Sequence, residues 1–508
     1  MNKRAVLFLS SLILTISVYS QQAVLNYPID LGDSFFSNDR KCHPYISPDK
    51  DKICLFLVDK RDVAALFFNS SFQLIKRINF VKPLSADYSE FVGCTKSEDG
   101  FTIYFLNSSE DKISVASFNI STGATKAFPG VIKFDKERFI EGVELNNKFY
   151  LLTVLKKTSK LKLFEFKTSS EYQSFDFDFS ANTFINGLTE EVSTIYHALK
   201  TEVGRETNTI HISKIPFSEE CTMLMAAQPN KFYYYDKFIV LTFDHYNSNT
   251  QVITINVDDH TAAIKRMPKE KSEYMGPNNM KSNSYLYKNY FFSYMSSSDD
   301  FKINVYDFET RKLVKTFYTK EKEEIAYKNT PICLEKSFGQ LIEADRELTK
   351  TKQFLRKLYN GGILSLGIYE VKDGKMVATI GAVQVPMPNY NTGNAAGLPV
   401  FTRAGVLSDI SKGVPVGQAY RYDFNPYYIG YYSQADTKNT YFKGVFNETD
   451  LSHLKEDKIE KTIFDLVEEY EVKNPTHAYA QTIFRFDNHY YYGRYTKGSK
   501  KYTLFLMK

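Results

Sequence analysis

The chain consists largely of short stretches in which apolar and polar residues alternate, separated by turns rich in Asn, Asp and Gly. One recurring unit is a strand, a tight turn and an aromatic strand. Its copies are Val143–Tyr150, Tyr233–Ile239, Leu286–Phe291 and Phe484–Tyr490, with looser ones at Ser47–Ile53 and Lys96–Phe101. Asn and Asp accept the left-handed backbone that a tight hairpin turn requires, and aromatic residues suit a half-buried strand. The pattern therefore predicts a series of β-hairpins.

A second hairpin follows each of these units after about twenty residues. Its copies include Ile113–Gly123, Leu161–Ser169, Ile253–Asp259, Ile303–Thr310 and Ile368–Gly374. The turns fall near Ser70, Thr122, Ser169, Ser218, Asp259, Thr310 and Asp373, about 50 residues apart on average. Four strands in each such period are typical of a β-propeller, in which every blade buries its faces against its neighbours. A row of separate β-sandwiches is the alternative, but this period is too short for a seven-stranded sandwich.

The two ends of the chain suggest how the ring closes. Thr482 to Leu506 provides about three strands, and Ala23–Ile29 is a lone strand before the first full repeat. We expect this N-terminal strand to be the fourth strand of the last blade. The sequence thus predicts an all-β protein, a single β-propeller over residues 21–508 with about eight blades, seven being the alternative.

The period is lost between about residues 330 and 480, which we interpret as an insert containing helices. Ser337 and Gln340 fit a capping box, and the leucine spacing that follows predicts a helix over 337–359. A strand is the alternative for Lys352 to Tyr359. A second helix is predicted from Asp450 to Tyr470, capped by Asp450 or Thr449.

Between these predicted helices, residues 381–426 contain six Gly and five Pro. Long irregular connections are often functional. This segment either caps one face of the ring or packs on its outside. The candidate ligand-binding residues in and beside it are aromatic or cationic: Tyr390, Arg403, Tyr420, Arg421, Tyr422, Tyr427 and Tyr428.

The amino-acid composition argues against one class of propeller and one class of partner. Among 508 residues there are 41 Phe and 37 Tyr but no Trp, so the Trp-Asp element of WD40 repeats is absent. We expect the Phe and Tyr to pack between blades. The net charge of +5 lacks the clustered Lys and Arg of a nucleic-acid-binding protein. No nucleic acid is therefore expected as a partner.

Residues 1–20 have the pattern of a secretory signal peptide. Lys3 and Arg4 precede an apolar run from Ala5 to Val18, and Ser20 suits a cleavage site. An uncleaved membrane anchor is the alternative, but the run is shorter than the roughly 20 residues of a span. We expect export to the periplasm or the cell surface and a mature chain without a transmembrane segment.

The cysteines and the other chemistry-bearing residues give no catalytic or metal-binding motif. Cys42 and Cys54 flank one predicted hairpin and are either a disulfide or, as we favour, buried thiols. The chain has no zinc-binding spacing and no nucleophile elbow, so no metal and no cofactor are predicted. Asp176 and Asp178 alternate on one strand, which we interpret as a solvated face rather than a Ca²⁺ site.

In Tyr45–Ile53, which contains Ser47-Pro48-Asp49-Lys50, the chain resembles exported bacterial β-propellers of the TolB-like kind. Lys50 stands where those repeats usually have Gly, and the resemblance carries over no catalytic residue. It implies a secreted or periplasmic propeller that binds or scaffolds a protein or glycan of the cell envelope. The alternative is a glycan-active enzyme, a lyase or hydrolase, with its site at the mouth of the propeller channel.

Overall fold

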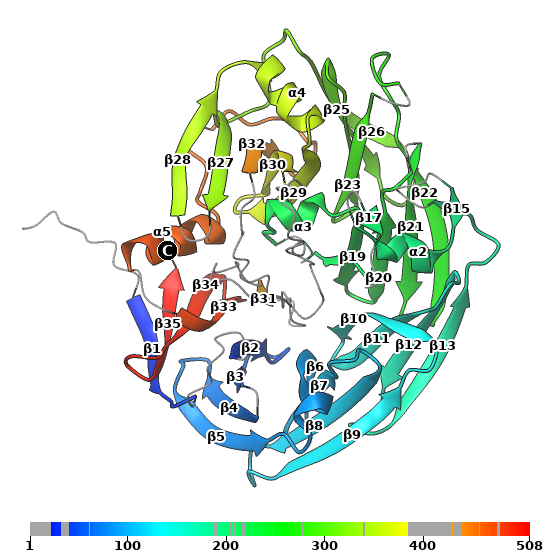
Figure 1. The fold of residues 1–508 in the computed structure, drawn as a ribbon. Helices are drawn as coiled ribbons and strands as arrows, with labels where there is room; N and C mark the ends of the chain where they lie inside the picture. Colours follow the sequence, from blue (N-terminus) through cyan, green and yellow to red (C-terminus); the bar gives the residue numbers. More distant parts are fainter. Residues whose placement is uncertain are drawn as a thin grey trace, which may run out of the picture.

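The molecule is a ring of seven sheets arranged around a common axis as the blades of a β-propeller (Figure 1). This count, like every other structural statement below, concerns the part of the chain that the structure, a computed structural model, describes. That part comprises residues 22–31, 40–59, 61–185, 191–202, 205–206, 210–215, 217, 219–246, 248–276, 279–338, 341–384, 428–429, 438–456, 458–474 and 478–507. The propeller predicted from the repeat is confirmed.

Three consecutive blades have the simplest order, four strands that follow one another outward from the axis. Blade 1 contains β2 (Lys41–Ile46), β3 (Lys52–Val58), β4 (Asp62–Asn69) and β5 (Leu74–Val81). Blade 2 contains β6 (Glu90–Ser97), β7 (Gly100–Leu106), β8 (Lys112–Asn119) and β9 (Thr125–Lys133). Blade 3 contains β10 (Glu137–Leu145), β11 (Lys148–Leu155), β12 (Lys160–Phe166) and β13 (Tyr172–Asp178).

Blade 5 repeats this order, whereas blades 4, 6 and 7 have five strands each. From the axis outward, blade 4 has β18 (Ser213–Lys214), β19 (Asn230–Tyr235), β20 (Phe238–Phe243), β21 (Asn249–Asn256) and β22 (Thr261–Pro268). Blade 5 has β23 (Lys281–Tyr287), β24 (Tyr290–Ser296), β25 (Asp300–Asp307) and β26 (Leu313–Lys320). Blade 6 has β29 (Ile363–Val371), β30 (Lys375–Gln384), β32 (Lys438–Asn447), β27 (Ile332–Phe338) and β28 (Leu341–Leu348). Blade 7 has β31 (Tyr428–Ile429), β33 (Ala478–Phe486), β34 (His489–Thr496), β35 (Lys501–Met507) and β1 (Gln22–Pro28).

The remaining described elements are short. Two small hairpins, β14 (Phe184–Ile185) with β15 (Val192–Ser193) and β16 (Thr201–Glu202) with β17 (Arg205–Glu206), lie between blades 3 and 4. The helices are the 3₁₀ turn η2 (Ser85–Tyr88), α2 (Ile195–Lys200), α3 (Met223–Ala227), α4 (Thr351–Tyr359) and α5 (Ile463–Lys473). None of the helices in the described residues has the length and apolarity needed to cross a membrane.

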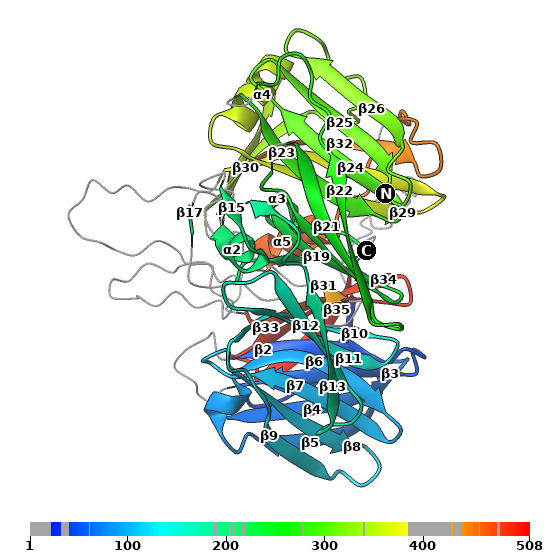
Figure 2. The ribbon, with the colours of Figure 1, turned by 90° about the vertical axis from the view of Figure 1, so that its right-hand side faces the viewer.

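The strand order gives the ring two different faces. On the hairpin face lie the turns between the first and second strands of a blade and between the third and fourth. On the connection face lie the turns between second and third strands and the connections from one blade to the next. The elements α2 and β15, between blades 3 and 4, project at this connection face when the ring is viewed from its side (Figure 2).

The hairpin turns form where the sequence predicts them. Asn146 and Asn147 have φ angles of 52° and 60°, and Asp487 and Asn488 have 48° and 59°. This left-handed backbone at both central positions is that of a type I′ turn, whose twist matches the flanking strands. Local residue chemistry is therefore sufficient to set these hairpins.

The ring is closed by the N-terminal strand, as predicted. β1 pairs antiparallel with β35, from Gln22 opposite Leu506 to Pro28 opposite Lys501. Ile29 and Leu31, which follow β1, are 3% and 6% exposed and pack in the apolar cluster between blades 7 and 1. The first and last described strands, β1 and β35, thus lie side by side in one blade and close the ring of described blades.

Seven sheets rather than eight means that the smaller of the two predicted blade counts holds for the described residues. The extra turn in the repeat count is the one near Ser218, itself outside the described residues. The residues around it, 213–227, form an inner strand and a short helix at the axis instead of a blade of their own. The turns near Ser169 in blade 3 and Asp259 in blade 4 lie on either side of this segment. The spacing of about 50 residues between turns therefore continues across it by coincidence, although the segment forms no blade.

The helix predicted over 337–359 is wrong in its first part. Residues 341–348 form β28, and only Thr351–Tyr359 is helical, as α4. β27 pairs with β28 on one side and with β32, about a hundred residues later, on the other. This pairing outweighs the helical spacing of Leu341, Ala344 and Leu348.

The helix predicted from Asp450 to Tyr470 begins too early. The side chain of Asn447 accepts hydrogen bonds from Thr449 N at 2.8 Å and Asp450 N at 3.2 Å, which makes this stretch a turn. Leu451 has a φ of 58°, incompatible with an α-helix. The helix α5 starts at Ile463, and Thr462 caps it in a capping box with Asp465.

None of the five cysteines, all of which lie in the described residues, is part of a disulfide bond, so Cys42 and Cys54 are not paired. The two lie on opposite faces of blade 1. Cys42 packs in the cluster toward blade 7, and Cys54 packs in the cluster toward blade 2. Cys42, Cys54 and Cys94 are buried, in agreement with the interpretation that we favoured.

Aromatic side chains fill the spaces between blades, which explains the surplus of Phe and Tyr. Phe67 of blade 1 stacks on Phe101 of blade 2, with ring centroids 5.4 Å apart. Two buried tyrosines also reach across to the next inner strand. The Tyr45 hydroxyl accepts a hydrogen bond from Lys96 N at 3.1 Å, and Tyr233 accepts one from Leu286 N at 3.2 Å. Each of these tyrosines thus connects its own blade to the next one by a hydrogen bond between its hydroxyl and a backbone amide.

Blades 3 and 4 are also joined by a buried carboxylate, Glu165, whose side chain is 1% exposed. It contacts Lys148 at 2.9 Å, Lys167 at 2.6 Å and His260 of blade 4 at 2.9 Å. Burial acts to raise the pKa of Glu165, but the hydrogen bonds from Lys167, Lys148 and His260 outweigh it and lower the pKa to about 2. The ionised form of Glu165 is therefore the one that stabilises the fold.

Replacing Glu165 with Gln should remove part of the acid sensitivity of the protein. The folded-state pKa lies below the usual value, so the stabilisation is complete above about pH 4.5 and is lost as the pH falls toward 2. We expect the wild type to lose on the order of 3 kcal/mol more than E165Q over this range. Denaturant unfolding measured at pH 2.5 to 7 tests this. The matched control is Asp176→Asn, whose exposed carboxylate should contribute little. Parallel pH profiles of wild type and E165Q would contradict the assignment.

Candidate functional site at the ring axis

The connection from blade 3 to blade 4 enters the interior of the ring, where residues 213–227 lie at the axis. We call this segment the hub; Pro216 and Ser218 within it are outside the described residues. It contains β18, a turn and the short helix α3, which lies inside the ring beside β29 and β30 (Figure 1). At this position one segment can reach several blades.

Toward blades 3 and 4, the hub makes both side-chain and backbone contacts. Lys214, whose side chain is 4% exposed, donates to the Gly142 carbonyl at 2.8 Å and lies 3.9 Å from the Glu141 carboxylate. Its ammonium group also lies over the ring of Tyr234. β18 pairs in parallel with β19. The hub thus adds an inner strand to blade 4 and an ion pair to blade 3.

Toward blades 5 and 6, the contacts use backbone carbonyls of α3. The Asn283 side-chain amide on β23 donates to Ala227 O at 2.9 Å and to Leu364 O of blade 6 at 2.6 Å. The Ser365 hydroxyl of β29 donates to Met223 O at 2.7 Å. The bond to Ala227 O satisfies a carbonyl at the end of α3, which has no partner within the helix. The bond to Leu364 O joins blade 5 directly to blade 6.

Toward blade 7, the hub presents two adjacent glutamates. Glu219 accepts hydrogen bonds from Arg485 Nη1 at 2.6 Å and from the Tyr490 hydroxyl at 2.9 Å. Glu220 accepts one from Ile463 N, at the start of α5, at 2.7 Å. The described residues of the hub therefore connect five of the seven blades found in the described part of the chain, which makes the hub the structural centre of the ring.

Several ionisable groups gather around this axis, and burial shifts them strongly. Burial raises the pKa of Glu220 and of Glu144 to about 8. The Glu144 carboxyl accepts a hydrogen bond from the Tyr45 hydroxyl at 2.9 Å. Burial and the charges of Glu141, Glu144 and Glu219 raise the pKa of Tyr234 well above its usual value. Carboxyl groups that are partly protonated near neutral pH can transfer protons, which is the chemical capacity of this cluster.

Solvent access to the cluster is limited. Most of its side chains are buried, and the more open members are Glu219, 15% exposed, and Arg485, 32% exposed. Arg485 and Tyr490 flank the turn at Asp487–Asn488, so this open part lies on the hairpin face.

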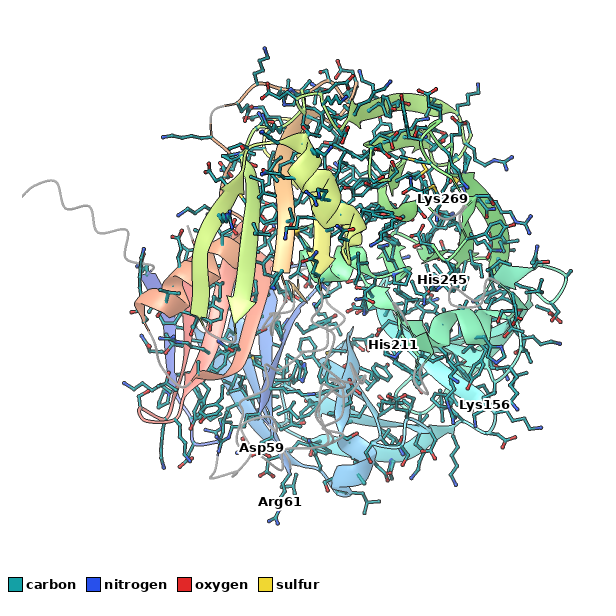
Figure 3. All side chains as sticks on the ribbon, turned by 45° about the horizontal axis from the view of Figure 1, so that its top comes forward. Asp59, Arg61, Lys156, His211, His245 and Lys269 are labelled. Atoms are coloured by element: carbon teal, nitrogen blue, oxygen red, sulfur yellow. The ribbon has the colours of Figure 1, made fainter. Side chains whose placement is uncertain are left out.

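A second charged group is closed to solvent altogether. Asp244, which follows β20, lies 3.4 Å from both Lys231 of β19 and Lys269, and the three side chains are 0–1% exposed. Its carboxylate also accepts hydrogen bonds from Thr250 and Ser284, each at 2.6 Å. Lys269 lies in the part of the ring formed by blade 4, as does His245 (Figure 3).

Burial lowers the pKa of Lys231 to about 8 and also lowers that of Lys269. Burial acts to raise the pKa of Asp244, but the two lysines outweigh it and keep it below its usual value. Each ammonium group is held by further acceptors, such as the Asn283 side chain at 2.5 Å from Lys231. The network joins blades 4 and 5 and presents no open face to a ligand.

The residues selected from the sequence do not coincide with this axis. Tyr390, Arg403, Tyr420, Arg421, Tyr422 and Tyr427 lie outside the described residues. Tyr428 is in β31, where its backbone pairs with Phe484 of β33, and its side chain is not described. The hub is a part of the molecule that was not predicted from the sequence. The sequence feature that could have indicated the hub is the long stretch between β13 and β19, which has no blade hairpins. The regular spacing of the predicted turns concealed this feature.

No group of three or more His, Cys, Asp or Glu side chains in the described ranges is placed to hold a metal ion. The described imidazoles make structural contacts, such as His245 with Asn230 at 3.0 Å and His453 with Asn329 at 2.9 Å. Asp176 and Asp178 are exposed while Phe177 is buried between them. This confirms a solvated strand face there.

Comparison with known proteins finds matches among solved structures. No protein-family model and no curated protein matches the sequence. A solved oligogalacturonate lyase in complex with manganese is matched over 96% of this chain and 98% of that chain, at 8% identity and a TM-score of 0.35. The WD40 domain of SCAP from fission yeast is matched over 81% and 86%, at 10% identity and a TM-score of 0.28.

A cobalt-substituted Synechocystis ACO is matched over 57% of this chain, at 9% identity and a TM-score of 0.28. The chain spans 63% of the length of that protein. At such identities no residue role passes from these proteins to this one.

Proposed function

We propose that this β-propeller is a binding or scaffolding module that is exported to the periplasm or cell surface and engages a protein or glycan of the cell envelope. The observation that carries the proposal is the hub. A segment at the axis that hydrogen-bonds to five blades makes the ring a rigid frame, and rigid frames are used to present irregular binding loops.

The strands on either side of residues 385–437 support the same function. β30 ends at Gln384 and β32 begins at Lys438, both on the connection face, and β31 (Tyr428–Ile429) is the described part of the residues between them. We propose that the aromatic and cationic residues of this segment contact the partner. Tyr and Arg dominate the binding energy of many protein interfaces, which makes them suitable for this role.

A glycan-active enzyme is the second candidate, favoured by one observation, the carboxyl groups of Glu144 and Glu220 with pKa values of about 8. Glycoside cleavage needs two carboxyl groups that flank the scissile bond in an open cleft. Both of these groups are buried and are bonded within the protein, to Tyr45 and to Ile463. This arrangement fits a structural role better than a catalytic one, and the binding module is therefore the function that we propose.

Replacing residues 386–426 with a short Gly/Ser linker should abolish partner binding while the ring remains folded. The linker leaves β30, β31 and β32 intact, so the frame should keep its melting temperature. Affinity capture from an envelope extract, together with binding to envelope glycans, measures the loss. The matched control is Lys156→Ala with Lys157→Ala, a change at another connection-face turn that should retain the partner. Unchanged capture by the linker variant would contradict the assignment of this segment.

A further inference from the structure

A hollow at the outer rim of the ring is bordered by blade 4, by blade 5 and by the residues that follow blade 3. Its volume is about 470 Å³, and it is lined by Asn182, Ile264, Lys265, Arg266, Glu309 and Arg311. The middle three of these belong to β22, the outermost strand of blade 4, and the last two to the turn before β26 of blade 5 (Figure 1). A hollow of this size lies in the range of small-molecule sites.

Blade 5 contributes a well-ordered turn that carries Arg311. The Asp307 side chain accepts hydrogen bonds from Thr310 N at 2.7 Å and from the Thr310 hydroxyl at 2.6 Å. Arg311 N donates to Asp307 O at 2.9 Å. Lys265 holds the same turn from blade 4, because its ammonium group donates to Phe308 O at 3.0 Å and lies 3.8 Å from the centre of the Phe308 ring. The backbone that positions Arg311 is therefore fixed by the protein itself.

The residues that follow blade 3 are held to blade 4 in a similar way. The side chain of Gln251 on β21, a residue that is 4% exposed, donates to Thr183 O at 2.6 Å. Asn182 N donates to Phe179 O at 2.9 Å, which closes a turn. Gln251 is also the partner of Arg266 in the ladder between β21 and β22. Asn182 and Arg266 are thus placed by one set of contacts.

The hollow contains hydrogen-bond donors that the protein does not use. Within the described part of the chain, the guanidinium groups of Arg266 and Arg311 and the side-chain amide of Asn182 form no hydrogen bond or ion pair. Lys265, in contrast, is engaged by Phe308 and lies 3.4 Å from the Glu309 carboxylate. Three cations and one carboxylate give the lining a formal charge of +2. The free donors and the charge both favour an anionic ligand.

The chemistry of the lining favours a doubly charged anion. A guanidinium group presents its N–H donors in a planar fork that matches the oxygen atoms of a phosphate or a carboxylate. A phosphate monoester carries a charge of about −1.5 to −2 at pH 7, which complements this lining better than one carboxylate does. The edge position of β22 adds backbone N–H groups, since an edge strand leaves a row of them unpaired. Ile264 is partly buried and supplies apolar surface beside the charges.

We propose that this hollow binds the phosphate monoester group of a small ligand, which Arg266 and Arg311 hold between blades 4 and 5. Asn182 donates a hydrogen bond to the bound group or to a hydroxyl beside it, and Ile264 contacts the carbon skeleton. These residues are distinct from residues 385–437, so the site is a function in addition to the proposed binding of an envelope partner. The phosphate can belong to a soluble sugar phosphate or to a lipid headgroup, which share this chemistry.

Isothermal titration calorimetry of the full-length protein with glucose 6-phosphate tests the site. We expect saturable binding of glucose 6-phosphate, weaker binding of the monoanion glucuronate and no binding of glucose. The double variant Arg266→Met, Arg311→Met should bind glucose 6-phosphate at least about tenfold more weakly, because it loses two charged forks. Absence of binding to the wild type, equal binding by the double variant, or glucuronate binding as tight as that of the phosphate would overturn the proposal.

Two single variants show whether the effect belongs to this hollow. Arg77→Met is the matched control, since Arg77 is an exposed arginine on β5, the edge strand of blade 1, and should be dispensable. A loss in R77M equal to that of the double variant would show a general surface effect and contradict the site. Glu309→Gln removes the carboxylate from the lining and should strengthen binding about threefold. Unchanged or weaker binding by E309Q would contradict a phosphate beside Glu309.

Two further measurements separate the source of the phosphate and the two proposed functions. Flotation with phosphatidylcholine vesicles that contain phosphatidic acid should show binding that glucose 6-phosphate displaces if the group is a lipid headgroup, and no binding if it is a soluble sugar phosphate. Vesicle binding that persists in the double variant would contradict the site. The variant with a linker in place of residues 386–426 should bind glucose 6-phosphate as the wild type does, even where it loses the envelope partner. Loss of both would overturn the location of the anion site.

Discussion

Replacing Asp244 with Ala should destabilise the protein by about 3–5 kcal/mol, the usual cost of removing one partner from a buried ion pair. The variant would leave the ammonium groups of Lys231 and Lys269 in the interior without their shared counter-charge. It would also leave the hydroxyl groups of Thr250 and Ser284 without their acceptor. Blades 4 and 5 should separate first, because this network joins them.

Denaturant unfolding at neutral pH measures this effect. The matched control is Glu309→Ala, which removes an 80% exposed carboxylate that also pairs with a lysine at 3.4 Å. Exposed pairs contribute at most about 1 kcal/mol, so this variant should be close to wild type. Equal stabilities of D244A and E309A would show that the buried charges are not coupled as the distances indicate.

Deleting residues 21–31 should have the other large effect, because it opens the ring. The deletion removes the six-residue ladder between β1 and β35 and the buried side chains of Ile29 and Leu31. A buried aliphatic side chain contributes about 1.5–3 kcal/mol and a backbone hydrogen bond about 1 kcal/mol. We therefore expect a loss of at least about 5 kcal/mol and a clear fall in melting temperature.

A synthetic peptide of residues 21–31 provides the control for this deletion. Added in excess, it should pair with β35 and restore part of the melting temperature, since a ligand that binds only the folded state stabilises it. A peptide with Pro in place of Asn26 and Leu25 should fail to do so. An unchanged melting temperature in the deletion variant would refute closure by the N-terminal strand.

The parts of the fold that could be predicted from the sequence are those set by local chemistry. Asn146-Asn147 and Asp487-Asn488 specify hairpins because their backbones adopt the left-handed region easily. The repeat of such hairpins, together with one lone strand at Ala23–Ile29 and about three strands from Thr482 to Leu506, was sufficient to predict a closed propeller. The capping box of α5 is also a local signal. The helical pattern of the residues before it placed the predicted start of this helix too early, at Asp450.

The parts that could not be predicted depend on partners far away in the chain. Residues 341–348 are a strand because β27 brings them into a sheet with β32, which the leucine spacing does not reveal. Lys231 and Asp244 are separated by a hairpin in the sequence, and only the adjacent blade supplies Ser284 and Asn283 to complete their network. The seven candidate residues of the irregular segment stay a prediction.

What the sequence by itself determined about this protein is the repeating hairpin, the propeller class and the strand that closes it. Each follows from the backbone preferences of a few residues and from the need of every blade to bury two apolar faces. Only the tertiary structure decided that the ring has seven blades among the described residues and that a hub occupies its axis. The amino-acid sequence of the hub has no regular alternation of apolar and polar residues. Its polar groups form their hydrogen bonds one by one with five different blades, so no repeat in the sequence marks it.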